Sequence, residues 1–210
     1  MDEVNSIIGK LIAEADKAYH DGSGSTTMSD SAYDSLRKLA PDNMNVGAPA
    51  VTSSFQKVAH AERLRSLDNV FSVEELNEWM TRITQGGVAG EFKLDGLALC
   101  LTYNDRKLVR AATRGDGTVG DDVTRHARYI DNIPLELPAE IPHTAFEITG
   151  EVLMLRSTLE QVNADLIGAG KQPLANTRNA AAGALRNIDP TILQTRKLVF
   201  VPYGFSQSLI

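Results

Sequence analysis

The chain has 210 residues, of which 42% are hydrophobic and 23% are charged, and its formal net charge is −6. Its single cysteine, Cys100, excludes a disulfide framework and a four-cysteine zinc site within these residues. No apolar run approaches the roughly 20 residues of a membrane-spanning helix, and the start lacks a secretory signal, so we expect a cytoplasmic protein without membrane contact. The acidic balance argues against strong DNA binding by this chain alone.

The first 40 residues have the pattern of a helical hairpin. Apolar side chains recur at helical spacing through residues 3–20, and the glycines and short polar residues of 21–27 interrupt them. A second short helix is expected from Asp30 to Leu39, ended by Pro41. Residues 41–65 look like a linker with little periodicity. We therefore expect a helical region with its linker over 1–64, and a second domain over 65–210.

The second domain mixes strand and helix signals. Ser72 with Glu75, and Ser157 with Glu160, form capping boxes that predict helices to about Ile83 and to near Gly168. Strands are expected at 91–103, 108–113 and 145–155, with a turn at 104–107 and a glycine-rich loop at 114–121 before another helix. Hairpins joined to helices, without a regular strand–helix–strand repeat, predict an α+β fold.

One stretch of the first expected strand carries three charges on one face. Alternation would point Glu91, Lys93 and Asp95 one way, and Phe92 and Leu94 the other. Such charges beside a buried strand need partners or a polar cleft. A lysine there can lose its proton when it is desolvated or crowded by cations, and it is then a nucleophile. The same pattern also fits an exposed edge with a ladder of alternating charges.

Six blocks of sequence change the weight of these two interpretations. Lys93–Gly96 is similar to the Lys-x-Asp-Gly motif of covalent nucleotidyltransferases. Together with their neighbours, the blocks resemble, in order, the adenylation region of NAD-dependent DNA ligases. They cover residues 29–34, 66–71, 91–98, 111–124, 150–152 and 175–186. The resemblance implies a helical NAD-recognition hairpin followed by an incomplete nucleotidyltransferase domain with antiparallel sheets and flanking helices.

The resemblance also implies a reaction and a set of site residues. Lys93 would attack the α-phosphate of NAD, release nicotinamide mononucleotide and carry AMP for a 5′-phosphate at a nick in double-stranded DNA. Mg²⁺ is the expected cofactor, with no metal site built from the protein alone. The implied NAD-binding residues are Tyr19, His20, Asp30, Ser31, Ala32, Tyr33, Asp34, Ser66, Leu67, Glu91, Arg114 and Glu151. The implied phosphate or DNA contacts are Asp95, Arg178 and Arg186.

Within this set, the resemblance gives the adenine to Glu91, the adenylate side of the site to Arg114, and the ribose to Glu151. The hairpin would close over the nicotinamide half, where Tyr33 offers a ring face to a cation. Other interpretations remain open from the residues themselves. Arg114 could be a cap over the glycine-rich turn, Tyr33 a packing aromatic beside helix-capping acids, and residues 178–186 a small-residue packing helix with solvated arginine ends.

The chain departs from the family pattern in three places. Thr149 stands where the family usually has arginine, and Thr177 where it usually has proline. After Ile210 the family continues with further strands, an oligonucleotide-binding barrel, a zinc finger and helix-hairpin-helix motifs. The chain is then either one subunit of a split ligase, with a second polypeptide supplying these parts, or a fragment, and we favour the split subunit. The rival interpretation is a non-catalytic NAD-binding or regulatory module, and covalent AMP on Lys93 would distinguish the two.

Overall fold

We describe the fold from a computed structural model. It describes residues 7–15, 28, 32, 35, 36, 39, 55–65, 67, 69–141 and 145–206. The elements with assigned bounds are β1 (Lys57–Ala59), α3 (Val73–Thr81), β2 (Leu97–Asn104), β3 (Lys107–Thr113), β4 (Val119–Asp121), α4 (Thr124–Ala127), β5 (Phe146–Leu153), α5 (Arg156–Gly168), α6 (Thr177–Leu185), α7 (Ile192–Arg196) and β6 (Val199–Ser206). The expected α+β class is confirmed as a mixed chain with antiparallel sheets.

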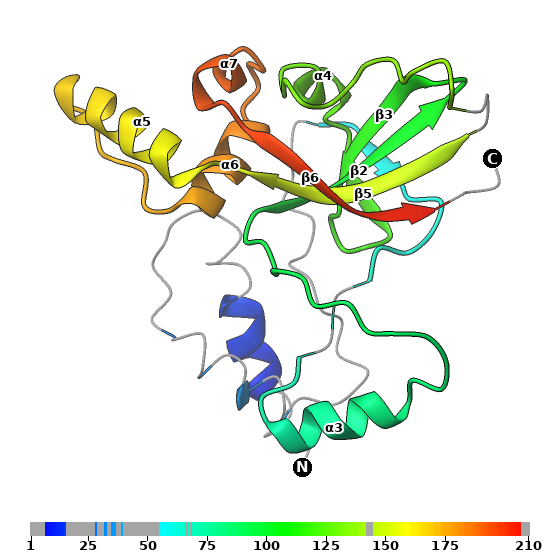
Figure 1. Cartoon of the computed structure of the whole chain (residues 1–210). Helices are drawn as coiled ribbons and strands as arrows, with labels where there is room; N and C mark the ends of the chain where they lie inside the picture. Colours follow the sequence, from blue (N-terminus) through cyan, green and yellow to red (C-terminus); the bar gives the residue numbers. More distant parts are fainter. Residues whose placement is uncertain are drawn as a thin grey trace.

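A four-stranded antiparallel sheet with the order β3-β2-β5-β6 forms the centre of the fold (Figure 1). Its first hairpin, β2–β3, turns at Asp105 and Arg106, whose φ angles of 50° and 65° are both left-handed. Two left-handed residues in succession form a type I′ turn, and the twist of this turn matches the twist of the flanking strands. The turn, β3 and the part of the first strand from Leu97 onward agree with the sequence-based prediction.

The two faces of the sheet have different partners. Leu99, Leu101 and Tyr103 alternate along one face of β2 and belong to the hydrophobic core, where each is at most 1% exposed. Helix α6 packs against β2 and β5, and α7 packs against α6. Cys100 and Thr102 alternate with these residues and therefore point to the opposite face. That second face carries polar side chains, and the candidate site lies on it.

Residues 55–64, expected to be part of a linker, are instead bonded to the glycine-rich loop. Strand β1 pairs antiparallel with β4, in the register Lys57 to Asp121, and the Lys57 ammonium lies 2.7 Å from the Asp121 carboxylate. The linker prediction was wrong here because a three-residue strand with mostly exposed side chains leaves no periodicity to detect. The predicted domain boundary at 64/65 stays a prediction.

Little of the expected N-terminal hairpin falls among the described residues. Residues 7–15 are helical, with Ile8 and Ile12 buried and Ile7 and Leu11 more exposed. Ala32, Ser35, Leu36 and Leu39 are also helical. The intervening turn and the packing of one helix on the other lie outside the described residues, so the hairpin stays a prediction.

The two capping boxes have different outcomes. In α3 the Ser72 hydroxyl accepts a hydrogen bond from the Glu75 N–H at 3.1 Å, as predicted, and the helix ends at Thr81. Helix α5 ends at Gly168 as expected, but it begins at Arg156 after Leu155, with no side-chain cap. The capping role of Ser157 was therefore wrong, because the helix already includes that residue.

Helix α6 packs through small residues, and these include Ala180 and Ala181 of the small-residue stretch expected to pack closely (Ala180–Ala182 and Gly183). Ala180, Ala181 and Ala184 are almost fully buried. A side-chain carbon at Gly183 would meet nothing within 4 Å, so this glycine does not serve close packing. The helix turns its alanine face to the sheet because alanine allows close approach without losing rotamer freedom.

Candidate functional site

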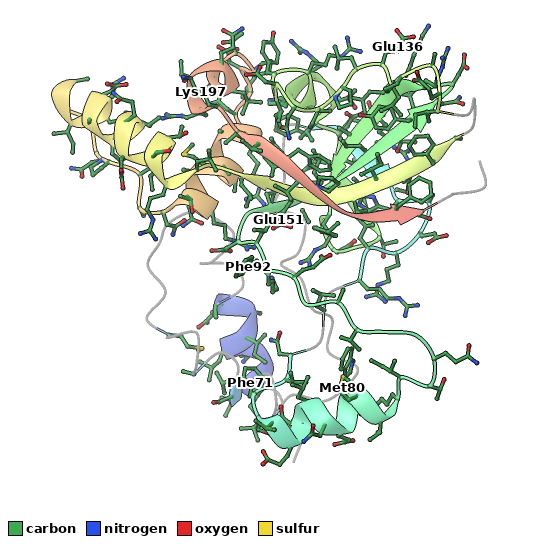
Figure 2. All side chains as sticks on the ribbon, viewed as in Figure 1. Phe71, Met80, Phe92, Glu136, Glu151 and Lys197 are labelled. Atoms are coloured by element: carbon green, nitrogen blue, oxygen red, sulfur yellow. The ribbon has the colours of Figure 1, made fainter. Side chains whose placement is uncertain are left out.

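The site is built around the junction between Gly96 and Glu151. The Gly96 N–H donates to Glu151 Oε1 at 3.2 Å, and a side-chain carbon at Gly96 would lie 2.2 Å from the Val152 carbonyl oxygen. Only glycine allows the segment before β2 to pass so close to β5. Figure 2 shows Glu151 on the side of the sheet toward the segment that carries Phe92.

This junction corrects the expected strand over residues 91–96. Pairing of β2 with β5 begins at Leu97, opposite Val152, and residues 91–95 have no strand assignment. The reason is that Gly96 gives its N–H to a side chain instead of a neighbouring strand. The expected ladder of charges on one strand face is therefore wrong, although Glu91, Lys93 and Asp95 are all exposed.

An ion pair ties the lysine segment to helix α6. Arg178 Nη1 lies 2.8 Å from Asp95 Oδ1, although 83 residues separate the two in sequence. The Asp95 side chain is 70% exposed and that of Arg178 is 24% exposed. Exposed pairs are individually weak, so the contact is better regarded as a constraint on where the segment lies than as a source of stability.

Three cations surround the carboxylate of Glu151. Burial raises its pKa above the ordinary glutamate value, and the Gly96 N–H with the charges of Arg178, Lys93 and Arg114 acts in the opposite direction. The carboxylate thus lies within electrostatic reach of a lysine from the loop, an arginine from α6 and an arginine from the end of β3. Positive charge gathered beside a half-buried carboxylate is suited to a phosphate-bearing ligand.

Tyr203 completes this group, and the sequence did not predict its role. It lies at a β-bulge of β6, between Pro202 opposite Gly150 and Gly204 opposite Thr149. Burial and the Glu151 charge raise its pKa and Arg114 lowers it, so the hydroxyl is within electrostatic reach of both residues, while 58% of the residue remains exposed. Bulges at sheet edges redirect a side chain in this way.

A buried polar cluster lies further along the same face of the sheet. The Glu147 carboxylate accepts from the Thr102 hydroxyl at 3.0 Å and from Arg110 at 3.2 Å. Burial raises the pKa of the Cys100 thiol to about 12, and Glu147 adds to the rise. Cys100 is therefore a neutral packing residue, and the cluster joins β2, β3 and β5 through side-chain hydrogen bonds on this face.

Comparison with known proteins identifies this arrangement. Residues 52–209 match the family model for the NAD-dependent DNA ligase adenylation domain. The chain belongs to this family. The match begins just before the Phe55–Leu64 segment, so this segment belongs to the adenylation-domain match together with the sheet.

Individual relatives agree with the assignment. A DNA ligase of Thermobifida fusca (strain YX) is 40% identical over 210 residues, which cover 90% of this chain and 28% of the relative. A DNA ligase of Bartonella tribocorum is 39% identical over 219 residues, which cover 94% of this chain and 30% of the relative. A DNA ligase of Corynebacterium aurimucosum is 46% identical over 167 residues, which cover 78% of this chain and 25% of the relative. The chain thus spans less than a third of the length of these relatives.

The site residues implied by resemblance fall into three groups. Lys93, Asp95, Arg114, Glu151 and Arg178 are brought together around the Gly96 junction. Glu91, Leu67, Ala32 and Arg186 are exposed, and Arg186 caps the far end of α6 from Arg178. The remainder lie outside the described residues: Tyr19, His20, Asp30, Ser31, Tyr33, Asp34 and Ser66.

Two further features of this adenylation region concern metals and membranes. Among the residues that the structure describes, no group of three or more His, Cys, Asp or Glu side chains is arranged to hold a metal ion. No helix in the same part of the chain has the length and apolar character to cross a bilayer.

Thr149, the residue where the resemblance led us to expect arginine, lies opposite Gly204 on β6. A side-chain carbon at Gly204 would be 2.2 Å from the Thr149 hydroxyl.

The raised pKa of Glu151 gives a pH-dependent prediction. Because the folded chain holds the Glu151 proton more tightly than the unfolded chain, the associated stability is complete at acid pH and is lost as pH rises through the raised value. We expect Glu151→Gln, which keeps the oxygen that accepts from Gly96, to melt at a higher temperature than wild type at pH 7.

Thermal unfolding of both proteins between pH 4 and pH 8 measures this difference, which should shrink toward pH 4. Glu140→Gln, at an exposed carboxylate, gives the background for a change of one charge. A Glu151→Gln protein that is less stable than wild type at pH 7 would show that the surrounding cations outweigh burial.

Proposed function

We propose that this chain takes AMP from NAD onto Lys93, as the first step of DNA ligation. The observation that carries the proposal is the position of the Lys93 segment, which Gly96 and Asp95 hold beside Glu151, Arg114 and Arg178. Family membership supports NAD as the AMP donor. Transfer of AMP to the 5′-phosphate of nicked double-stranded DNA is the corresponding later step.

The chemistry needs a neutral lysine and a stabilised phosphate. The Lys93 amine forms a bond to the α-phosphorus of NAD, and the bond from that phosphorus to the bridging oxygen breaks. Nicotinamide mononucleotide leaves with the electron pair, and the amine proton passes to solvent. Arg114 and Arg178 lie where fixed positive charge would stabilise the crowded phosphate oxygens in the transition state.

Tyr203 and Glu151 give the nucleotide a place to bind. The Tyr203 ring is more than half exposed while its hydroxyl lies near Glu151, so a flat base can stack on the ring beside a carboxylate that accepts sugar hydroxyls. The adenine contact assigned to Glu91 stays a prediction, as does the nicotinamide contact of the N-terminal residues.

Mg²⁺ fits this site only as a companion of the phosphates. Mg²⁺ is commonly held by one or two carboxylates together with substrate phosphate oxygens, and it neutralises their charge. The half-buried Glu151 carboxylate is the donor available among the described residues of the cluster, because Asp95 is engaged by Arg178. Mg²⁺ would therefore enter with NAD, held chiefly by the phosphate oxygens, and it would neutralise their charge.

Two arginines of helix α6 support the proposal that DNA accepts the AMP. Arg178 lies at the site and Arg186 is exposed at the other end of the helix, so the pair could follow a phosphate backbone. The net charge of −6 disfavours tight binding of duplex DNA by these residues alone. A second polypeptide with further ligase domains stays a prediction.

The proposal is tested by the mass of the chain. Purified protein incubated with NAD and Mg²⁺ should gain the mass of one AMP, and peptide mapping should place it on Lys93. ATP with Mg²⁺ is the matched control and should add nothing. A chain that binds NAD but remains unmodified would favour the non-catalytic module instead.

A further inference from the structure

Residues 56–64, here called the strap, lie along the glycine-rich loop and bond to it repeatedly. The His60 N–H donates to the Thr118 carbonyl at 2.9 Å, and the Leu64 N–H donates to the Gly117 carbonyl at 2.8 Å. The Gln56 carbonyl accepts from Asp122 at 2.8 Å. The strap and the loop thus form one bonded unit.

The His60 side chain adds a contact of a different kind. Its Nε2 lies 3.1 Å from the carbonyl oxygens of both Thr113 and Arg114. Carbonyl oxygens only accept, so Nε2 must carry the hydrogen and share it between them. A side-chain carbon at Gly120 would lie 3.0 Å from this nitrogen, so glycine leaves room for the ring at this position.

Arg114 is thereby held on both sides of its α-carbon. Its N–H donates to the Ala98 carbonyl of β2 at 3.2 Å, while its carbonyl accepts from the His60 side chain at 3.1 Å and from the Gly117 N–H at 3.0 Å. The charge of its side chain acts on Glu151 and Tyr203, whose pKa values it lowers. Small rotations of the Arg114 backbone would be amplified at the end of a long side chain.

We propose that His60 is a positioning residue for Arg114, acting through the Arg114 backbone and never touching the nucleotide. The inference rests on the proposed function, since it concerns the same site. It differs from a purely structural role in one respect: the effect of losing His60 must pass through the arginine side chain.

The test compares single and double variants for AMP transfer to Lys93, measured per folded molecule at saturating NAD. His60→Leu removes the donor, and we expect the rate to fall about tenfold or more, because displaced catalytic groups are costly. His60→Gln keeps an N–H donor near the Nε2 position and should recover most of the rate. In an Arg114→Ala background, His60→Leu should have no further effect.

Two controls separate positioning from folding. His126→Leu removes another histidine–carbonyl contact, 2.7 Å from Nε2 to the Asn187 oxygen, on α4. It should lower thermal stability without changing the rate per folded molecule. Calorimetric binding of AMP to the same variants gives a second measurement without turnover, in which His60→Leu weakens AMP binding only when Arg114 is present.

The outcomes are distinguishable. Equal reaction and equal AMP binding by wild type and His60→Leu, or fully additive losses in the double variant, would overturn the role of His60 and leave the proposed function intact. A wild-type chain that neither accepts AMP on Lys93 nor binds AMP would overturn both proposals.

Discussion

Replacing Lys93 by alanine should abolish the AMP adduct, lowering its formation by at least about 10³-fold, because no other group can form the same phosphorus–nitrogen bond. The side chain is exposed and lies within electrostatic reach of the half-buried Glu151, so its removal should leave the fold unchanged. Intact mass spectrometry after incubation with NAD and Mg²⁺ measures the result.

Two matched variants distinguish the loss of the nucleophile from the loss of a positive charge. Lys93→Arg keeps the positive charge near Glu151 but cannot lose its proton, so it should also form no adduct. Lys171→Ala removes an exposed lysine between α5 and α6 and should react like wild type. An adduct that survives in Lys93→Arg would place the nucleophile elsewhere.

The sequence predicted the elements whose signals are local. The β2–β3 hairpin has alternating side chains and a polar turn, and helix α3 has a capping serine, so each could be located without knowing its partners. Strand β6 was not predicted, because Pro202 and Gly204 disfavour a central strand. The structure accommodates them at the edge of the sheet, with a bulge at Tyr203.

The site was predicted in part, for a related reason. Motif resemblance pointed to Lys93, Arg114 and Glu151, and the structure brings these residues together. The Asp95–Arg178 pair joins residues 83 positions apart, and Tyr203 reaches the site only through the bulge. Neither relation leaves a trace in local spacing, because both depend on strand order and register.

The same limit applies to residues 91–95. Their alternating pattern continues smoothly into β2, so periodicity alone could not show where strand pairing begins. The start is set by the close approach of Gly96 to β5, which is a property of the packed sheet. That approach leads to the last prediction.

Gly96→Ala should damage both stability and AMP transfer. The added carbon would lie 2.2 Å from the Val152 carbonyl oxygen, 2.5 Å from Leu153 Cδ2 and 2.9 Å from Glu151 Cγ. The Leu153 methyl group can rotate away, but the Val152 carbonyl belongs to β5, which is paired on both sides, so the backbone cannot move cheaply. Overpacking of this kind typically costs about 1–3 kcal/mol.

The functional loss should exceed what unfolding explains. Relieving the clash moves Gly96 away from β5, weakens its hydrogen bond to Glu151, and displaces Lys93 three residues earlier. A displacement of about 1 Å can cost roughly 10²-fold in rate, so Gly96→Ala should transfer AMP about 10²-fold more slowly even where it is fully folded.

Gly90→Ala is the matched control, since its added carbon meets nothing within 4 Å, and its stability should stay within about 0.5 kcal/mol of wild type. Melting curves fix a temperature at which all three proteins are folded, and adduct formation is then timed at that temperature. A Gly96→Ala protein that reacts as fast as wild type would show that the Gly96–Glu151 contact does not hold Lys93 in place.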